Sequence, residues 1–477
     1  MDEKKKEEQL EKNFLLFFWA VFLCMLFFGL VVFILYSFRT IAYPYITDYT
    51  EGHVLMLSRL LHEEGTYFFD VNNYPMINGV YTPVYIFATS LFLDSFFSPY
   101  VFGRMTSFLA AFFISVLLFS VFYRKSKNKI LSFALSGLFF FPFYVIRWST
   151  MNRPDVLAIA LSFAGILAYY FWYKKKSPIR FLSIILFLLA YFTKQSAIIA
   201  PASVLFYALI CDRKEFAKFS ALYFLPLAAG ISLLEVATGG LFIEHVIRLM
   251  RFLSPIRWEY FTFVYQEFLR PNSILVILIV VNIFLFRRHR LFTIYFLLNL
   301  LFVIARTKPG GNYNLLLEAH LSILLLGGMI FIDVYATKEK ARTLMVSFLL
   351  LYAFLQFPYE LSKELYYFPL VPERIAQDKT VSYYVENASG PILSEDMGIL
   401  VTHGKDFYYE PFTFTTLYKY GYQPDNKIVQ DCKNEIFSVI IAGQNIFDRP
   451  ELSECLREHY IQKAAFPLYS VFIRGAK

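Results

Sequence analysis

The chain has 477 residues, of which 57% are hydrophobic and 20% aromatic, and its mean hydropathy is +0.50. One or two soluble cores do not need so much apolar surface, so the composition excludes an ordinary soluble protein and indicates an integral membrane protein. The formal net charge of +8 would suggest nucleic-acid binding in a soluble domain, but in a membrane protein the Lys and Arg residues first indicate which loops face the cytoplasm.

The chain begins with a charged segment, residues 1–13, which we expect in the cytoplasm. The apolar run 14–38 that follows is roughly 25 residues long, enough to span about 30 Å of hydrocarbon. It is too long for the apolar part of a signal peptide, and no small-residue cleavage site follows it. We therefore predict a signal anchor.

The first outer loop, 39–99, contains the stretch "TDYTEG", in which Asp48 and Glu51 precede an apolar-periodic run. An acidic residue followed three positions later by Glu is typical of a capping box. The predicted amphipathic helix ends at Gly65 and is expected to lie in the membrane interface. The run 83–93 is too short to span and is expected at the membrane edge. The two carboxylates are either a helix cap or acid–base groups at the membrane surface.

Further apolar runs bring the predicted number of spans to about eleven. These runs cover residues 100–123, 130–146, 154–173, 181–193, 195–211, 219–238, 273–286, 291–305, 314–335 and 343–357. The runs within 181–211 are short, so they are either two spans or a re-entrant pair. Every second connection is short and basic, which places these connections in the cytoplasm, the amino terminus inside and the carboxyl terminus outside. The basic connections are 124–129, 174–180, 212–218, 287–290 and 338–342.

The outer face carries the first loop, a second loop at 240–272 and the tail 360–477, so it is expected to be the working face. In the tail, β-rich runs such as "GPILSED", "FSVIIAG" and "YSVFIR" alternate with helical stretches such as "RPELSECLREHY". This pattern predicts a small soluble α/β domain outside the membrane. Cys432 and Cys455 lie in this tail and either pair there or stay free.

Ionisable residues collect at the outer ends of the predicted spans and avoid their middles. They comprise Arg104, Arg147, Arg153, Lys194, Arg306 and Lys308 together with Asp155, Glu318 and His320. A single cation at a helix end ordinarily extends to the headgroups. Several outward cations oppose the positive-inside bias, however, and predict a site for an anion, for which phosphate is the natural ligand. A group transfer from a phosphate needs such cations and a base, and Asp48 would supply the base.

The stretches "RWSTMNRPDVLAIALSFAG", "YFTKQSAIIAPA", "PGGNYNLLLE" and "SEDMGILVTHGKDFYYEPF", with the acidic first outer loop, resemble bacterial membrane glycosyltransferases of the GT-C superfamily. The nearest resemblance is to the protein-mannosyltransferase-like and aminoarabinose-transferase-like branch. It covers most of the chain through short motifs. It implies an α-helical polytopic enzyme of the plasma membrane, with a GT-C-like membrane domain at 14–357. Such an enzyme moves a sugar from a polyprenyl-phosphate donor to a lipid, glycan or protein acceptor at the outer face, usually with inversion and without a soluble cofactor.

The resemblance places the catalytic base on Asp48 and a second acidic residue on Asp155. Glu51 is a neighbour that shares or replaces the role of Asp48, because many relatives have adjacent acids where this chain has "DYTE". A divalent metal held by Asp48 and Asp155 stays open. The donor phosphate is expected on Arg153 and Lys194.

Further residues are assigned to the same site. Second-rank donor contacts are Arg104, Arg306 and Lys308. Contacts to the sugar, or support behind the site, are assigned to Gln195, Asn312, Asn314, Glu318 and Tyr49. Ordinary packing or anchoring at the interface is an equally good explanation of the polar and aromatic residues in this second group.

Two other function classes compete with the enzyme. A transporter or flippase of a lipid-linked glycan would place its site near the bilayer midplane, between internal repeats. Here the predicted midplane is apolar and no repeat of halves is evident in the sequence. A scaffold whose tail binds a partner is the third possibility.

Overall fold

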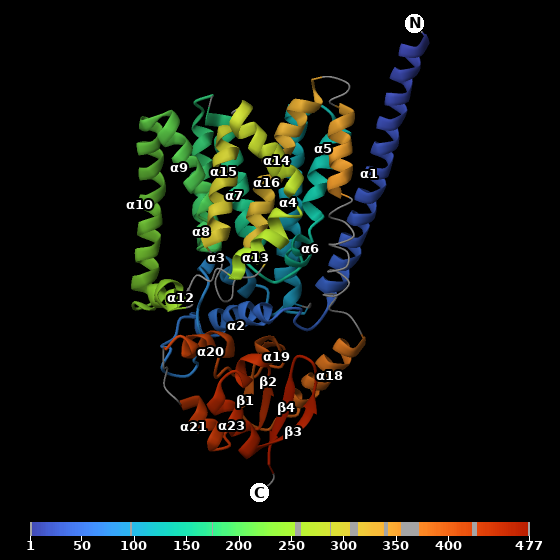
Figure 1. The fold of residues 1–477 in the computed structure, drawn as a ribbon. Coiled ribbons are helices and arrows are strands. Elements are labelled where there is room, and N and C mark those ends of the chain that lie inside the picture. Colours follow the sequence, from blue (N-terminus) through green and yellow to red (C-terminus); the bar gives the residue numbers. More distant parts are fainter. Residues whose placement is uncertain are drawn as a thin grey trace.

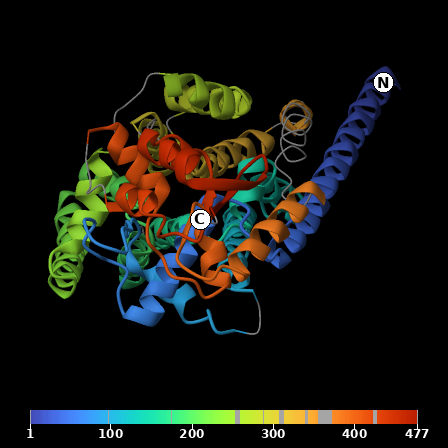
Figure 2. The same cartoon turned by 90° about the horizontal axis from the view of Figure 1, so that it is seen from below.

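The structure is a computed structural model that describes residues 2–95, 98–173, 175–252, 259–286, 288–305, 313–337, 342–353, 372–421 and 427–475. A bundle of helices occupies one part of the molecule, and a small α/β domain formed by the tail lies at the end opposite the amino terminus (Figure 1). The helix α1 (Asp2–Ala42) stands at one edge of the bundle, and its amino-terminal end projects away from it (Figure 2).

Five described helices are long and apolar enough to cross a membrane. They are α1, in which the span covers Gln9–Ala42, α4 (Tyr100–Ser126), α7 (Asp155–Tyr173), α10 (Arg213–Ala237) and α16 (Asn314–Tyr335). A sixth span would be the pair Phe261–Leu269 and Ser273–Phe284, which is bent by 87°. Shorter apolar helices occupy the remaining predicted runs: Lys129–Phe140, Pro178–Thr193, Ile199–Cys211, Arg290–Val303 and Arg342–Ala353. A helix therefore lies in each predicted run, while the count of about eleven spans stays a prediction.

The shorter elements of the bundle complete this framework. They are α5 (Lys129–Gly137), η1 (Leu138–Phe140), α6 (Phe143–Trp148), η2 (Pro178–Phe181), α8 (Leu182–Thr193), α9 (Ile199–Cys211), α11 (Leu241–Ile243), η3 (Glu244–Arg248), α12 (Leu249–Phe252), α13 (Glu259–Val264), η4 (Tyr265–Leu269), α14 (Ser273–Val281), η5 (Asn282–Phe286) and α15 (Arg290–Ala305). The run 181–211 forms two helices, α8 and α9, joined by a turn that begins at Lys194.

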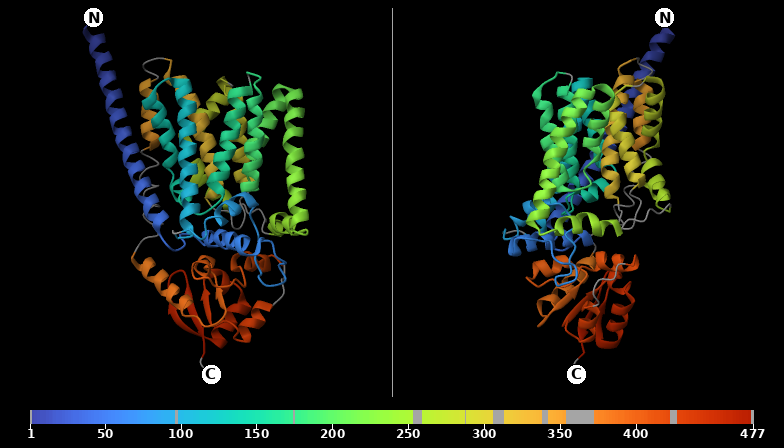
Figure 3. Two further views of the ribbon diagram at one scale, coloured as in Figure 1. Left: turned by 180° about the vertical axis from the view of Figure 1, so that it is seen from behind. Right: turned by 90° about the vertical axis from the view of Figure 1, so that its left-hand side faces the viewer.

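The basic connections meet one another at the same end of the bundle. Asp333, near the end of α16, pairs with Lys125 at the end of α4 and with His289 before α15, whose Nε2 lies 2.7 Å from the carboxylate. Arg180 and Glu215 join two further connections at 2.8 Å. The alternation read from the sequence thus corresponds to two distinct ends, and the tail lies at the end without these connections (Figure 3).

The first outer loop forms α2 (Tyr49–Glu64) and α3 (Pro83–Ser90). Asp48 is the N-cap of α2, and the helix ends at Gly65, whose φ of 71° lies in the left-handed region that glycine adopts readily. Instead of lying on a lipid surface, α2 is sandwiched between the bundle and the tail, and most of its side chains are buried (Figure 1). The predicted interfacial helix is thus an internal one.

The tail forms a four-stranded sheet covered by helices. Its strands are β1 (Ile392–Ser394), β2 (Val439–Ala442), β3 (Tyr460–Ala465) and β4 (Ser470–Arg474), in the order β1-β2-β4-β3. Strands β1 and β2 are parallel, and the other two pairs are antiparallel. The helices are α18 (Pro372–Glu386), α19 (Met397–Thr402), α20 (Pro411–Lys419), α21 (Lys427–Lys433), α22 (Gln444–Phe447) and α23 (Pro450–His459). The strands and the helix predicted in this region are confirmed.

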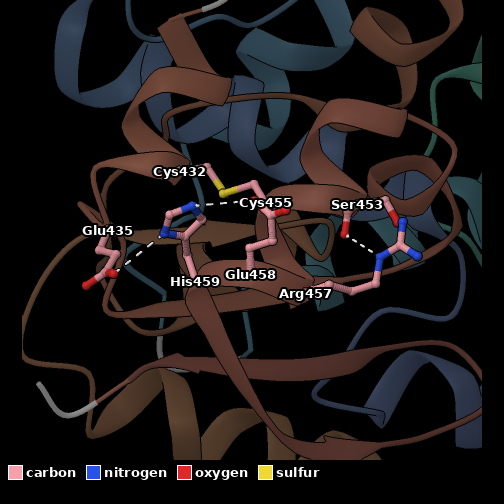
Figure 4. Close-up of a disulfide and its surroundings, with 7 residues drawn as sticks. All are labelled: Cys432, Glu435, Ser453, Cys455, Arg457, Glu458 and His459. Carbon is pink, nitrogen blue, oxygen red and sulfur yellow. Dashed lines mark hydrogen bonds and ion pairs between the residues drawn. A yellow bond between two sulfur atoms is a disulfide. The ribbon is translucent and has the colours of Figure 1, made fainter.

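A disulfide joins Cys432 on α21 to Cys455 on α23 (Figure 4). The two sulfur atoms are buried in the apolar core on one side of the sheet. His459 lies beside them and faces Glu435 at 3.7 Å. The structure thus answers the question that the sequence left open for these two cysteines.

The tail is docked closely on the first outer loop. A Cβ atom on Gly52 of α2 would lie 2.7 Å from the backbone nitrogen of Gly398 on α19, so the two helices approach where neither has a side chain. The backbone of Met76 donates to Tyr408 at 2.9 Å and accepts from Glu410 at 3.0 Å. A single apolar cluster runs from α2 and α3 into the sheet of the tail. The tail therefore rests on the same helix that begins at Asp48.

Candidate active site

Asp48 faces two guanidinium groups from the start of α2. Its Oδ1 accepts from the N–H of Thr50 at 3.1 Å and from the Thr50 hydroxyl at 2.5 Å. Nη2 of Arg147 lies 3.1 Å from Oδ2, and Nη1 of Arg153 lies 3.8 Å from Oδ1. Burial alone would raise the pKa of Asp48, but Arg147 and Arg153 outweigh it and hold the pKa below its usual range. The helix cap and the charged site are thus the same residue.

Arg153 connects Asp48 to a second carboxylate. Its Nε donates to Asp155 at 3.0 Å, and its Nη1 donates to the hydroxyl of Thr50 at 2.5 Å. Because Arg153 lies in the turn before α7, this guanidinium ties the beginning of α7 to the beginning of α2. Arg153 is nearly buried, so its orientation is determined by these partners.

Asp155, the first residue of α7, contacts residues at the end of α8 and at the start of α16. Lys194, which follows α8, forms an ion pair with it, and the side-chain amide of Asn314 donates to it at 2.8 Å. Asn314 begins α16. The residues "RPD", "TKQ" and "YN", far apart in the sequence, therefore meet at one end of the bundle.

The charges of this cluster do not cancel. Three cations, Arg147, Arg153 and Lys194, face two carboxylates, Asp48 and Asp155. The cluster carries one net positive charge at neutral pH, which favours binding of an anion. We call these five residues the charged cluster.

Glu51 lies outside the charged cluster and is closed off. Both of its oxygens accept from the guanidinium of Arg104, at 2.8 and 2.9 Å, and both side chains are 0% exposed. The N–H groups of Thr47 and Asn152 donate to the same carboxylate at 2.8 and 2.7 Å. In the expected capping box, Glu51 would reach the N–H of Asp48; it reaches one residue further, to Thr47.

Arg104 is equally committed. Its remaining N–H groups donate to the carbonyl oxygens of Thr40, Tyr43 and Tyr45, at 2.8, 2.5 and 2.7 Å. A substrate could reach neither Arg104 nor Glu51 without breaking this arrangement. These contacts favour a structural role for Glu51, which was assigned as a second catalytic carboxylate, and for Arg104, which was assigned as a second-rank phosphate contact.

The residues around Asp48 and Asp155 do not fit a divalent metal. The guanidinium of Arg153 lies between the two carboxylates and interacts with both. Among the described residues, no group of three or more His, Cys, Asp and Glu side chains gathers in a way that would hold a metal ion.

The other predicted residues divide into three groups. Tyr49 donates to Glu410 of the tail, and Gln195 donates to the backbone of Val80 at 2.7 Å, so both hold elements together beside the site. Glu318 accepts a hydrogen bond from Tyr295 at 3.0 Å and lines the same cavity as Asp155. Arg306, Lys308 and Asn312 lie outside the described residues.

The tail residues 394–396, "SED", cap backbone N–H groups within the tail. The Glu395 carboxylate accepts from the N–H groups of Gly443, Asn445 and Ile446 at 3.0 to 3.2 Å. Asp396 caps α19 by accepting from the N–H of Ile399 at 3.1 Å. Both carboxylates are buried.

Sequence reasoning did not assign Arg147 a role, although it was among the outward cations. The sequence indicated such a role only by placing Arg147 six residues before Arg153, in "RWSTMNR". Thr50, which holds both Asp48 and Arg153, was also missed; a hydroxyl inside "TDYTEG" carries no signal of its own.

Two solved structures of ArnT from Cupriavidus metallidurans share this fold. One, crystallised with undecaprenyl phosphate bound, is 11% identical with a TM-score of 0.63, and the match covers 94% of this chain and 98% of that one. The other, in the apo state, is 12% identical with the same TM-score and coverage. By sequence, neither a protein-family model nor a curated protein matches the chain. The chain thus has the fold of ArnT over nearly its whole length, which confirms the fold expected from the resemblance to the aminoarabinose-transferase-like branch.

Proposed function

We propose that this protein is a membrane glycosyltransferase that moves a sugar from a polyprenyl-phosphate donor to an acceptor at the outer membrane surface. The observation that carries the proposal is the charged cluster, in which a partly accessible carboxylate lies against cations with a net positive charge. The same fold binds undecaprenyl phosphate in one ArnT structure, which supports a lipid phosphate as the anion.

Asp48 takes the role of base in this proposal. Its side chain is 16% exposed, whereas that of Glu51 is 0% exposed. Asp48 accepts the proton of the acceptor hydroxyl, and the acceptor oxygen forms the new bond to the anomeric carbon. The bond from that carbon to the phosphate oxygen breaks, and polyprenyl phosphate leaves with the electron pair. A single displacement of this kind inverts the anomeric carbon.

Arg147, Arg153 and Lys194 stabilise the departing phosphate. Charge on the phosphate increases as the bond breaks, so fixed cations lower the energy of the transition state more than that of the bound donor. An anionic donor also draws the guanidinium groups away from Asp48. This raises the basicity of Asp48 at the point where a base is needed.

The disulfide and the basic connections support the proposed orientation in the membrane. Disulfides persist in oxidising compartments, so the bond between Cys432 and Cys455 supports a tail outside the cytoplasm. The amino terminus and the basic connections are at the opposite end, which places them inside by the positive-inside rule. The charged cluster is then at the outer surface of the plasma membrane, beneath the tail.

The test is donor consumption by the purified full-length protein in lipid vesicles. Undecaprenyl phosphates carrying different radiolabelled sugars are supplied with an extract of cell-envelope lipids and glycans as acceptors. The expected result is release of undecaprenyl phosphate together with transfer of label to an acceptor. Movement of an intact labelled donor across the bilayer without either product would contradict the proposal and favour the flippase.

A further inference from the structure

A small cavity lined by both polar and apolar residues extends from the charged cluster into the bundle. It lies between the start of α7, the turn after α8, and helices α15 and α16. Its polar lining consists of Asp155, Lys194, Ser196, Asn299, Asn314 and Glu318. The volume of the cavity is about 30 Å³, enough for one or two hydroxyl groups or waters.

Several oxygens in this cavity accept no hydrogen bond from a described residue. Within the described part of the chain, Glu318 accepts one hydrogen bond, from Tyr295 at 3.0 Å, and its second oxygen accepts none. Asn314 donates to Asp155 and Asn299 donates to the backbone of Tyr295, while no described donor reaches the amide oxygen of either. The cavity is thus rich in unused acceptors.

Burying the side chains of Asn299 and Glu318 among apolar helices costs free energy. Asn299 is 1% exposed and Glu318 is 9% exposed, and both are on helices that run through apolar surroundings. A polar side chain inside a membrane bundle either joins helices or serves a ligand. The bond from Tyr295 to Glu318 joins α15 to α16, but helix association does not explain acceptors left open towards a cavity.

The cavity is connected to the charged cluster by direct contacts. Asp155 contacts Lys194 and Asn314 of the cavity lining and, on its other oxygen, Arg153. Glu318 follows Asn314 by one helical turn, on the same side of α16. A group attached to a phosphate at Arg153 and Lys194 is therefore within reach of these acceptors.

We propose that this cavity is the subsite for the donor sugar, receiving one or two of its hydroxyl groups as hydrogen-bond donors to Glu318 and Asn299. The inference rests on the proposed function and adds the selection of the sugar to it. Unused acceptor oxygens favour a neutral, hydroxyl-bearing edge of the sugar. A sugar with a carboxylate at that edge is disfavoured, because the Asp155 carboxylate would repel it.

The experiment compares the best donor of the vesicle assay with analogues that each lack one hydroxyl group. At one position, removal of the hydroxyl is expected to raise KM of the unmodified protein roughly tenfold, the usual effect of losing one hydrogen bond. In Glu318→Ala or Asn299→Ala, KM for the intact donor should already be raised relative to the unmodified protein. Removing that same hydroxyl should then change KM of the variant less than twofold. Undecaprenyl phosphate without a sugar binds all these proteins with affinities within twofold of one another.

Ser322→Ala is the matched control, since Ser322 is buried one turn beyond Glu318 and bonds only within α16. In Ser322→Ala, removal of the hydroxyl from the donor should still raise KM roughly tenfold. If Glu318→Ala and Asn299→Ala keep that penalty too, the cavity is not the sugar subsite, although the glycosyltransferase stands. If no undecaprenyl-phosphate sugar is consumed by the unmodified protein, the proposed function and this inference fail together.

Discussion

The guanidinium of Arg104 holds the carboxylate of Glu51 through two hydrogen bonds, at 2.9 and 2.8 Å, with both side chains completely buried. The pair joins α2 to α4. Asp48, three residues before Glu51, instead belongs to the charged cluster and is partly exposed. One carboxylate of the "DYTE" stretch therefore holds the helix that positions the other.

Replacing Glu51 by Gln should reduce stability rather than chemistry. The substitution leaves the charge of Arg104 buried without its partner, which typically costs about 3–5 kcal/mol. We expect a clear loss in the melting temperature of the detergent-solubilised protein. Folded molecules that remain should keep their turnover rate.

The exposed pair Lys419 and Asp448 supplies the control, because its side chains are 58% and 31% exposed. Lys419→Ala should change stability by no more than about 1 kcal/mol. If the Glu51→Gln protein is as stable as the unmodified one but inactive, Glu51 acts in the chemistry and Asp48 loses its place as the sole base.

Replacing Asp48 by Asn should remove activity and leave the fold. The amide still caps α2 but accepts no proton at neutral pH, so turnover should fall roughly 10²- to 10⁴-fold. Binding of undecaprenyl phosphate should strengthen, because the phosphate no longer competes with Asp48 for Arg147 and Arg153. Asp94→Asn, in the same outer loop and 84% exposed, is the control and should leave both quantities unchanged. Full activity in Asp48→Asn would exclude Asp48 as the base.

Much of the fold could be predicted because its signals are local. Each apolar run contains a helix, the strands β1, β2 and β4 of the tail are in the predicted runs, and Asp48 caps α2, whereas β3 was not predicted. What the sequence could not show is which charges meet. Asp48 and Glu51 lie in the same short stretch of sequence, and nothing local tells their roles apart. They differ in their partners, because Glu51 pairs with Arg104 and Asp48 with Arg147.

The environment of α2 was predicted wrongly for a related reason. An apolar stripe indicates burial but not what covers it, and here both the bundle and the tail do. Asn299 carried a weak signal, since a lone amide within an apolar run is costly in a membrane. The residues that share its cavity come from α16 and from the turn at Lys194, which no local pattern connects.

Arg147 should control the pH dependence of the reaction. Burial raises the pKa of Asp48, whereas Arg147 and Arg153 lower it below the usual range of roughly 3.9. Asp48 in the free enzyme therefore stays ionised between about pH 5 and 8, and kcat/KM should show no loss from its protonation there. In Arg147→Ala the raising effect of burial on the pKa of Asp48 is less opposed, so the acid limb should move to higher pH. Arg248→Ala, an exposed cation elsewhere, should leave the profile unchanged. An identical acid limb in all three proteins would mean that Arg147 does not set the pKa of Asp48.

Gly398 should determine whether the tail stays docked. A Cβ atom there would lie 1.8 Å from the hydroxyl oxygen of Tyr100 and 2.8 Å from Ile46, so α19 must move away from α2 and α4. Overpacking of this kind costs typically about 1–3 kcal/mol, and Gly398→Ala should lower the melting temperature and expose the tail to limited proteolysis. Tyr100→Phe in the same chain removes the nearest clashing atom and should restore part of the protection. Gly390→Ala is the matched control, because its Cβ would meet Ser438 at an ordinary 3.5 Å. Since α2 carries Asp48, release of the tail should also lower activity, and a Gly398→Ala protein with normal protease resistance and turnover would show that the close approach of α19 to α2 is not needed for either.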